Sequence, residues 1–564
     1  MFVDDLSVAC WGKNLQVTYH IVQEALKKLQ LWADSNGFKF STAKSEYMII
    51  SRSHDTRNNN LQLVLNDQPL KKKDTIKILG LTFDRRLTWK KHIELLKREC
   101  HTRLRIIKAL SSKQWGSSTK ALLRIYRSVI RSKLDYGAIV YDSANKFLLQ
   151  TLQTIPNTAC RLCLGAFKTS PTNSLLIEAG ELPLNIRRME LCLKYTAAIS
   201  STPNNPAYHS ATKQLMSNKY QECTTPKPLR IRTPLYSEEL GITLPSLFTR
   251  SLGSIPPWQS QNIRINFELS QHDRPSTTPE TYRALFCELH EKNSPNIEYY
   301  TDGSVMTGRA GFAVTTDSNV LLAHRVHDCT NIFSCEAQAV LHALELIDTR
   351  EDNTSSTVYS DSMSCLSAID NQFSTNPIIQ NIQHMLQQLV SNNKTVNLMW
   401  IPAHQGIQGN ELADHSAKTA TSNERQLATR ITLSEGYKYI HESVKQYWNS
   451  KWLQAPRSKL HDVRNNIWET APTFKRSEQC VINRIRIGHT RLSHLHLIAK
   501  DPVSLCQRCN TPITVKHMLI ECTKYQDDKV RTGLTKDMPS MLNDHAECLR
   551  LIKFLKEVNL FNSI

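Results

Sequence analysis

The sequence predicts a multidomain chain of α/β and α regions, with a mixed five-stranded sheet and flanking helices over residues 294–425. Two observations predict this fold class. Short β-type runs alternate with stretches of helical periodicity over residues 294–425, and helical periodicity dominates the regions before and after. In addition, 564 residues are too many for one hydrophobic core, so three or four domains are expected.

Composition limits the classes of function. The chain has a net charge of +19, and because Lys and Arg bind polyanions by releasing counterions, nucleic acid is the expected partner. The 15 cysteines show no disulfide-type framework and no signal peptide is present, so we expect an intracellular protein of the nucleus and/or cytoplasm that is not secreted. No apolar run reaches 18 residues, so no membrane partner is expected. None of these features predicts the oligomeric state.

The first 200 residues predict short strands followed by basic helices. Two β-segments surround Asp4 and Asp5, and a helix and further strands follow. Residues 71–108 contain 13 Lys or Arg against 4 acids, a pattern typical of cationic helices that track phosphates without reading bases. The alternative for this run is a solvated basic helix pair without a ligand. Helical periodicity then continues to about residue 200.

A proline-rich segment separates these helices from the sheet region. Eleven of the 22 prolines lie between residues 201 and 295. Because proline at that density breaks helices and excludes central strands, residues 201–293 are predicted to be a linker with little core of its own. In the sheet region the predicted strands cover 296–301, 309–316, 319–327, 356–360 and 395–401, and the predicted helices cover 334–349, 362–370, 375–391 and 408–420.

Four acidic residues of the sheet region lie at predicted strand ends or on predicted helices. Asp302 and Asp361 are predicted at or just past strand ends, Glu336 begins a helix with Ser334 as N-cap, and Asp414 lies on the last helix. Acids that converge on a sheet edge raise one another's pKa unless a cation neutralises them, and hard divalent ions prefer oxygen ligands. Two such ions can clamp the attacking and leaving oxygens of a phosphodiester. The alternative is that each acid is a helix cap or a solvated surface residue.

The order of these motifs resembles a type 1 ribonuclease H domain. Asp302-Gly-Ser comes first, then Glu336 on a helix, Ser-Asp361-Ser after a strand, and His404-Gln-Gly ahead of Asn-Glu-x-Ala-Asp414. The resemblance implies a ribonuclease H-like sheet and cleavage of the RNA strand of RNA–DNA hybrids. It also implies that the four acids hold two Mg²⁺ ions, which Mn²⁺ can replace, and that His404 assists product release or proton transfer.

The N-terminal region resembles the second half of a reverse transcriptase palm from jockey-like non-LTR retrotransposons. The resemblance rests on Phe-Val-Asp4-Asp5, the following helix, and the Gly-Phe-x-Phe-x-x-x-Lys motif. It implies that residues 1–110 are a truncated palm end and thumb, and that residues 111–200 are the helical connection to ribonuclease H. A polymerase of this kind needs a further metal-binding Asp on an earlier strand, so Asp4 and Asp5 are interpreted as a polymerase remnant and DNA polymerisation is not expected.

Residues 426–564 are predicted to be a helical tail with a C-x2-C-x7-H-x4-C arrangement at 506–522. Such a set can supply four ligands to one tetrahedral, structural Zn²⁺. The ligands would be Cys506, Cys509, His517 and Cys522. The arrangement resembles the segment after ribonuclease H in the same retrotransposons. The alternative is three buried thiols and a core histidine.

The motifs therefore predict a metal-dependent endonuclease that cleaves the RNA strand of RNA–DNA hybrids as part of a retrotransposon reverse transcriptase. Two alternatives stay open: an inactive or domesticated remnant that only binds nucleic acid, and a fragment of a complete RNA-directed DNA polymerase. An Asp302→Asn change discriminates the first alternative, because a chain that only binds has no cleavage to lose.

Overall fold

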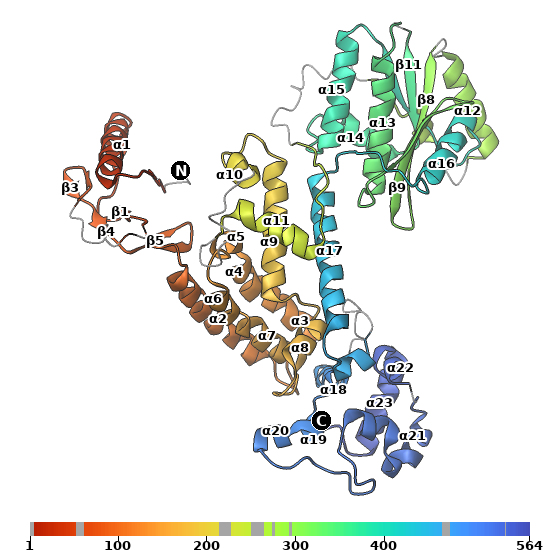
Figure 1. Cartoon of the computed structure of the whole chain (residues 1–564). Helices are drawn as coiled ribbons and strands as arrows, with labels where there is room; N and C mark the ends of the chain where they lie inside the picture. The colour runs from red at the N-terminus through yellow and green to blue at the C-terminus, as the bar shows by residue number, and fades with distance from the viewer. Residues whose placement is uncertain are drawn as a thin grey trace. The chain divides into compact units, whose positions relative to one another are not determined.

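A computed structural model describes the chain except for residues 1–4, 52, 54–60, 214–226, 250–263, 273–276, 293–295, 353, 465–473 and 536 (Figure 1). The chain divides into two compact units. The sheet unit comprises Cys192–Ser217 and Arg230–Tyr447, and the helical unit comprises Met1–Leu191, Asn218–Leu229 and Trp448–Ile564. The division falls within three helices, α9 (Leu184–Ser200), α11 (Leu229–Leu240) and α17 (Leu433–Gln454).

The sheet unit contains a six-stranded mixed sheet with the order β10-β9-β8-β11-β12-β7. The first three of these strands are antiparallel neighbours, and the remaining strands run parallel to β8. The strands are β7 (Arg264–Asn266), β8 (Ile297–Met306), β9 (Arg309–Thr315), β10 (Val320–Val326), β11 (Ser356–Ser360) and β12 (Val396–Trp400). The five predicted strands are present, and the sixth strand, β7, comes from the segment predicted to be a linker.

Strand β8 is longer than the sequence predicts. It pairs with the parallel strand β11 only as far as Thr301, but it continues against the antiparallel strand β9 to Met306. The hairpin closes through Thr307 and Gly308, whose φ values of 48° and 78° suit a tight turn that matches the twist of the strands. Asp302 therefore lies inside β8, not at or past its end as predicted.

Helices cover both faces of this sheet. Figure 1 shows α13, α14 and α15 on one side and α12 and α16 on the other. Their bounds are α12 (Pro279–Lys292), α13 (Ile332–Asp348), α14 (Met363–Asp370), α15 (Pro377–Ser391) and α16 (Gln408–Ala420). Two glycines permit close approach, because a Cβ at Gly303 would lie 2.6 Å from the Glu336 nitrogen, and one at Gly311 would lie 3.1 Å from the Thr421 nitrogen. α10 (Tyr208–Thr212) and the 3-10 helix η3 (Glu268–Gln271) complete the unit.

Part of the predicted linker belongs to the core of the sheet unit. Tyr282, Phe286 and Leu289 on α12 are at most 9% exposed. The rings of Phe286 and Tyr359 meet edge to face with centroids 5.3 Å apart. Pro279 occupies the first position of α12, where a missing N–H group costs no hydrogen bond. Averaging the composition over residues 201–293 hides this short amphipathic helix, and the linker prediction fails for α12 and β7.

The helical unit begins with α1 and several short strands and continues as packed helices. Its N-terminal part contains α1 (Leu15–Ser35), β1 (Glu46–Tyr47), β2 (Val64–Leu65), β3 (Gln68–Pro69), β4 (Lys71–Lys72), β5 (Thr75–Ile78), β6 (Leu81–Asp84), α2 (Lys90–Leu110), α3 (Thr119–Ile125), η1 (Tyr126–Arg131), α4 (Ser132–Asp135), α5 (Ala138–Tyr141), α6 (Lys146–Thr151), α7 (Thr154–Leu164) and α8 (Thr172–Ala179). Its C-terminal part contains η4 (Lys459–Asp462), α18 (Arg476–Ile487), α19 (Arg491–His494), α20 (His496–Ala499), η5 (His517–Glu521), η6 (Thr523–Tyr525), α21 (Gln526–Thr532), α22 (Met538–Asn543) and α23 (His545–Glu557). Across the described residues, no helix combines the length and apolar character needed to cross a membrane.

The C-terminal helices of this unit pack on α7 and α8. Arg476 on α18 donates from Nη1 to the Cys163 carbonyl oxygen at 2.6 Å. Glu178 on α8 pairs with Arg486 at 2.8 Å and with Arg464 at 3.5 Å, and all three side chains are at most 2% exposed. These buried ion pairs connect parts of the helical unit that are distant in sequence. Removing one of the three side chains would leave a buried charge without its partner.

Candidate metal centres

The candidate nuclease site lies where β8, β11 and α13 meet. Asp302 lies on β8 and is 7% exposed, while Asp361 directly follows the last residue of the neighbouring strand β11. Glu336 lies in the second turn of α13, whose N-terminal part approaches β8 at Gly303. Three of the four predicted acids are thus brought to one edge of the buried sheet.

The start of α13 sets the position of Glu336. The sequence predicts Ser334 as its N-cap, but the cap is Asn331, whose side chain accepts a hydrogen bond from the Ser334 N–H at 3.0 Å. Asn is also a preferred N-cap. The helix begins earlier than predicted because the apolar pattern extends back to Ile332, the residue after Asn331. The Glu336 carboxylate accepts a hydrogen bond from the Ser362 hydroxyl. Ser362 in turn caps α14 by accepting from the Cys365 N–H at 3.3 Å.

The three carboxyl groups have raised pKa values. Burial raises the pKa of Asp302 to about 8, and the charge of Asp361 adds to this shift, while the Gly303 N–H at 2.8 Å opposes it. Burial also raises the pKa of Glu336 and of Asp361, and in both groups a neighbouring acid adds to the shift. A bound cation would favour the ionised forms, so this donor set fits a hard divalent ion with oxygen ligands.

Asp414 lies in a second group of side chains, which come from the first two turns of α16 and from the loop before it. Its carboxylate accepts from Lys418 Nζ at 2.6 Å, across one turn of the helix. The ligand atoms of His404, Glu411 and Asp414 all lie within 4.8 Å of one another. His404 is exposed and has a φ of 56°. The charge of Asp414 contributes to the raised pKa values of Asp302 and Asp361, so the fourth acid is within electrostatic reach of these two.

Three supporting side chains were not predicted. Ser362 donates to Glu336, Asn410 Nδ2 lies 3.4 Å from Asp361 Oδ2, and Glu411 accepts from a backbone N–H of the His404 loop at 3.2 Å. Asn410 and Glu411 stand one helical turn before the fourth acid, and this spacing was the signal that could have identified them. Ser362 follows an acid and precedes a helix, which is typical of an N-cap.

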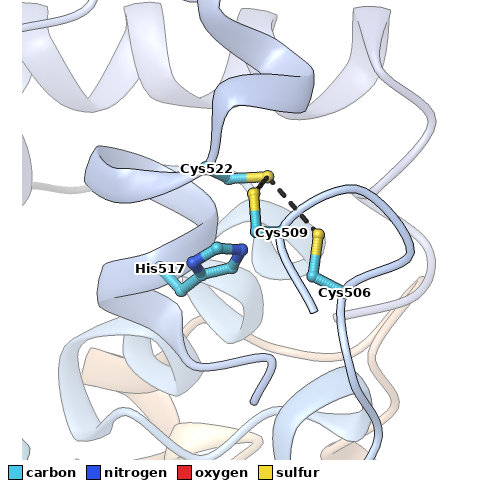
Figure 2. Close-up of side chains that lie close together, drawn as sticks. All are labelled: Cys506, Cys509, His517 and Cys522. Atoms are coloured by element: carbon cyan, nitrogen blue, oxygen red, sulfur yellow. Dashed lines mark hydrogen bonds between the residues drawn. The ribbon is translucent and has the colours of Figure 1, made fainter. Parts of the chain in front are cut away.

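The four predicted zinc ligands point toward one another (Figure 2). Their ligand atoms lie within 4.8 Å of one another, and Cys522 Sγ is 3.7 Å from Cys506 Sγ and 3.9 Å from Cys509 Sγ. A tetrahedral Zn²⁺ with Zn–S bonds of about 2.3 Å places its sulfur ligands about 3.8 Å apart. The thiols therefore have the spacing of a closed zinc site, with His517 as the fourth donor.

The surroundings of this cluster also fit a metal. Nε2 of His517 is buried and has no hydrogen-bond partner among the residues that the structure describes, while its Nδ1 lies 3.3 Å from Thr511 Oγ1. A buried ring nitrogen without a partner costs free energy that a metal bond would offset. Hydrogen bonds from Thr523 lower the pKa of Cys509 to about 7, which favours the thiolate that binds zinc.

The predicted polymerase remnant does not form a site in the described part of the chain. Asp4 lies outside the described residues, and Asp5 is exposed. No group of possible metal ligands that includes Asp5 is found among the described residues. The interpretation of this pair as a polymerase remnant stays a prediction.

Comparisons with known proteins agree with the fold of the sheet unit. Residues 294–422 match the RNase H family, so this part of the chain is an RNase H domain. The chain is 23% identical over 216 residues to the RNA-directed DNA polymerase from mobile element jockey of Drosophila melanogaster, covering 38% of this chain and 23% of that protein. It is 21% identical over 227 residues to the retrovirus-related Pol polyprotein from type-1 retrotransposable element R1 of Bradysia coprophila, covering 39% and 22%. These matches confirm the prediction of a jockey-like non-LTR retrotransposon polyprotein that contains RNase H.

A viral relative matches over a shorter stretch. The Pol polyprotein of equine infectious anemia virus (strain Wyoming) is 31% identical over 138 residues, covering 23% of this chain and 11% of that protein. The matched part of the chain spans less than a quarter of the length of each of these relatives. The activities of the complete relatives can therefore be assigned to this chain only as proposals.

Proposed function

We propose that the RNase H domain cleaves the RNA strand of RNA–DNA hybrids with two Mg²⁺ ions, which Mn²⁺ can replace. The proposed ligands are Asp302, Glu336, Asp361 and Asp414. The observation that carries the proposal is the cluster of three neighbouring carboxyl groups whose pKa values are raised by burial and by the charges of nearby acids. Divalent ions bound there would supply positive charge at the attacking and leaving oxygens of a phosphodiester.

The side chains around the acids have separate roles in this proposal. Ser362 and Asn410 hold the carboxylates of Glu336 and Asp361 through hydrogen bonds, which limits their movement during the reaction. His404 is exposed beside Asp414, so it can transfer a proton or assist release of the cleaved strand. Attack by water leaves a 5′-phosphate and a 3′-hydroxyl. Selection of a hybrid requires contacts with the 2′-hydroxyls of one strand.

The Cys₃His cluster is proposed to hold one structural Zn²⁺. Four protein donors leave no open coordination position, so the ion would stabilise the fold and would not activate water. Binding would occur mainly in the folded state, because the unfolded chain does not hold the four donors together. Measurement of the zinc content of the Cys522→Ser variant tests this proposal.

A second proposed function is phosphate binding by the helical unit. One side of α2 is buried through Ile93, Leu96 and Leu104. The exposed cations of the same helix are Lys90, Lys91, Arg98, Arg105 and Lys108. This separation favours binding of a nucleic acid backbone without base recognition. A chain that uses only this surface would be the binding-only remnant.

Cleavage by the full-length chain tests the nuclease proposal. The substrate is an RNA–DNA hybrid with different labels on its two strands, incubated with Mg²⁺ or with EDTA. We expect cutting of the RNA strand in Mg²⁺ only, and a loss of about 10³-fold or more in Asp361→Asn. Asp370→Asn is the matched control, because Asp370 is an exposed acid at the end of α14. Absence of cutting by the wild-type chain would favour the binding-only function.

A further inference from the structure

Arg283 lies beside the loop that carries His404, although it precedes the residues that match the RNase H family. A Cβ placed at Gly406 would be 3.5 Å from Cδ and Nη1 of Arg283 and 3.7 Å from its Nε. Gly406 has a φ of 75°, and its N–H donates to Glu411 at 3.2 Å. Glu411 in turn belongs to the group that contains His404 and Asp414. The guanidinium thus stands at the margin of the candidate nuclease site.

The helix that carries Arg283 is fixed to the sheet. Phe286 is buried against Tyr359, and Tyr282 donates its hydroxyl hydrogen to the His272 carbonyl oxygen at 2.8 Å. His290, one turn beyond Phe286, contacts the carboxylate of Glu298 on β8. These contacts lie on both sides of Arg283 along the chain. The position of its Cα relative to the His404 loop is therefore set by core packing.

The guanidinium itself is available to a ligand. Its side chain is 47% exposed, and its partner Glu280, at 3.0 Å, is 73% exposed. Exposed pairs of this kind contribute little free energy, so a phosphate can replace the carboxylate at small cost. A nucleic acid strand carries a phosphate about every 3.4 Å of helix axis. A strand that is cleaved at the acids will therefore carry further phosphates past the His404 loop.

We propose that Arg283 binds a backbone phosphate of the nucleic acid substrate next to the His404 loop. This inference rests on the proposed nuclease function and extends its binding surface to α12. Guanidinium is suited to the role because its fork of N–H groups can bind two phosphate oxygens at once. Arg283 would position the strand without taking part in bond cleavage.

Matched variants of the full-length chain test the proposal. Arg283→Ala removes the proposed contact, and Lys292→Ala is the control because Lys292 forms a similar exposed pair with Glu288 on the same helix. We expect Arg283→Ala to raise KM about 5- to 10-fold with kcat unchanged, and to lower the slope of log Kd against log salt by about 1. Arg283→Lys should recover part of the loss, since it keeps the charge but not the fork. Glu280→Ala should leave KM unchanged or lower it.

The failure of this inference can be distinguished from the failure of the nuclease proposal. Hybrid binding is also measured by fluorescence anisotropy in EDTA, which needs no cleavage. If the wild-type chain does not cut, the nuclease proposal fails, and the anisotropy comparison of the two variants still decides the role of Arg283. Equal affinities and salt slopes for wild type, Arg283→Ala and Lys292→Ala would overturn the inference. A fall in kcat with unchanged KM would also overturn it.

Discussion

The acid cluster and the Cys₃His cluster bring candidate metal ligands together in opposite ways. The acids come from positions as far apart as Asp302 and Asp414, and the fold holds them close although burial and like charges disfavour their ionised forms. The Cys₃His ligands all lie between Cys506 and Cys522, and their sulfur atoms already have the spacing of zinc ligands. The acid cluster therefore destabilises the folded state, whereas the Cys₃His cluster should stabilise it. Removing a ligand should change stability in opposite directions.

The largest expected effect is at the proposed zinc site. Cys522→Ser should remove one zinc per chain, because structural zinc sites contribute on the order of 10 kcal/mol of binding free energy to folding. We expect the region around residues 506–522 to become sensitive to proteases, and metal analysis should show the lost zinc. Cys287→Ser is the control, since Cys287 is exposed on α12. Full zinc content in Cys522→Ser would show that this thiol is not a ligand.

A substitution of a core residue that lies outside the residues matching the RNase H family tests whether α12 belongs to the core of the sheet unit. Phe286→Ala should lower the free energy of unfolding of the sheet unit by about 3–5 kcal/mol, because it leaves a cavity against Tyr359. Phe373→Ala should change it by less than about 0.5 kcal/mol, because Phe373 is 76% exposed. Denaturant unfolding measures both. Equal effects of the two substitutions would show that α12 is not part of the core.

Asp302→Asn should separate stability from activity. The substitution removes a buried carboxyl group whose ionisation is opposed by burial and by Asp361, so the free energy of unfolding at pH 7.5 should rise by up to about 5 kcal/mol. RNA cleavage should fall by about 10³-fold or more. Unfolding in EDTA and a cleavage assay measure the two effects, with Asp370→Asn unchanged in both. A lower free energy of unfolding in Asp302→Asn would contradict the claim that ligand removal changes stability in opposite directions at the two clusters.

The smallest expected effect is the pH dependence of stability in EDTA. Because the pKa of Asp302 is raised from 3.8 to about 8, the folded state binds more protons than the unfolded state between these values. The free energy of unfolding should therefore fall as the pH rises from 5.5 to 8.5. Asp302→Asn should reduce this slope, by up to about 3 kcal/mol over the range. A stability that rises with pH in the wild type, or an identical slope in the variant, would contradict the raised pKa.

Sequence patterns predicted the sheet region closely, because each element carries a strong periodicity of its own. The strand at 356–360 and the helix at 408–420 have the predicted bounds. The extension of β8 to Met306 was not predictable in the same way, since it depends on which partner strand continues beyond Thr301. Strand β7 was missed for a related reason, because three residues become a strand only when β12 lies beside them.

In the candidate nuclease site, too, the features that depend on tertiary packing could not be predicted from the sequence. Motif order selected the four acids as candidates, but the contacts that hold them depend on side-chain direction. Glu411 joins His404 and Asp414 through the turn at the start of α16, and Asp414 pairs with Lys418. Arg283 reaches this loop from a segment with no sequence link to the motifs. Such contacts become visible only when the packing of the sheet unit is known.

The most direct test of the acid cluster is calorimetric titration of the full-length chain with Mn²⁺ at pH 7. Measurements in two buffers with different ionisation enthalpies give the number of protons released. We expect binding to release about one proton, because a carboxyl group with a pKa of about 8 is mostly protonated at this pH and must ionise to bind a cation. Asp302→Asn should bind more weakly and release no such proton. Tight binding without proton release, or identical release by the variant, would contradict the proposal that these buried acids form a cation site.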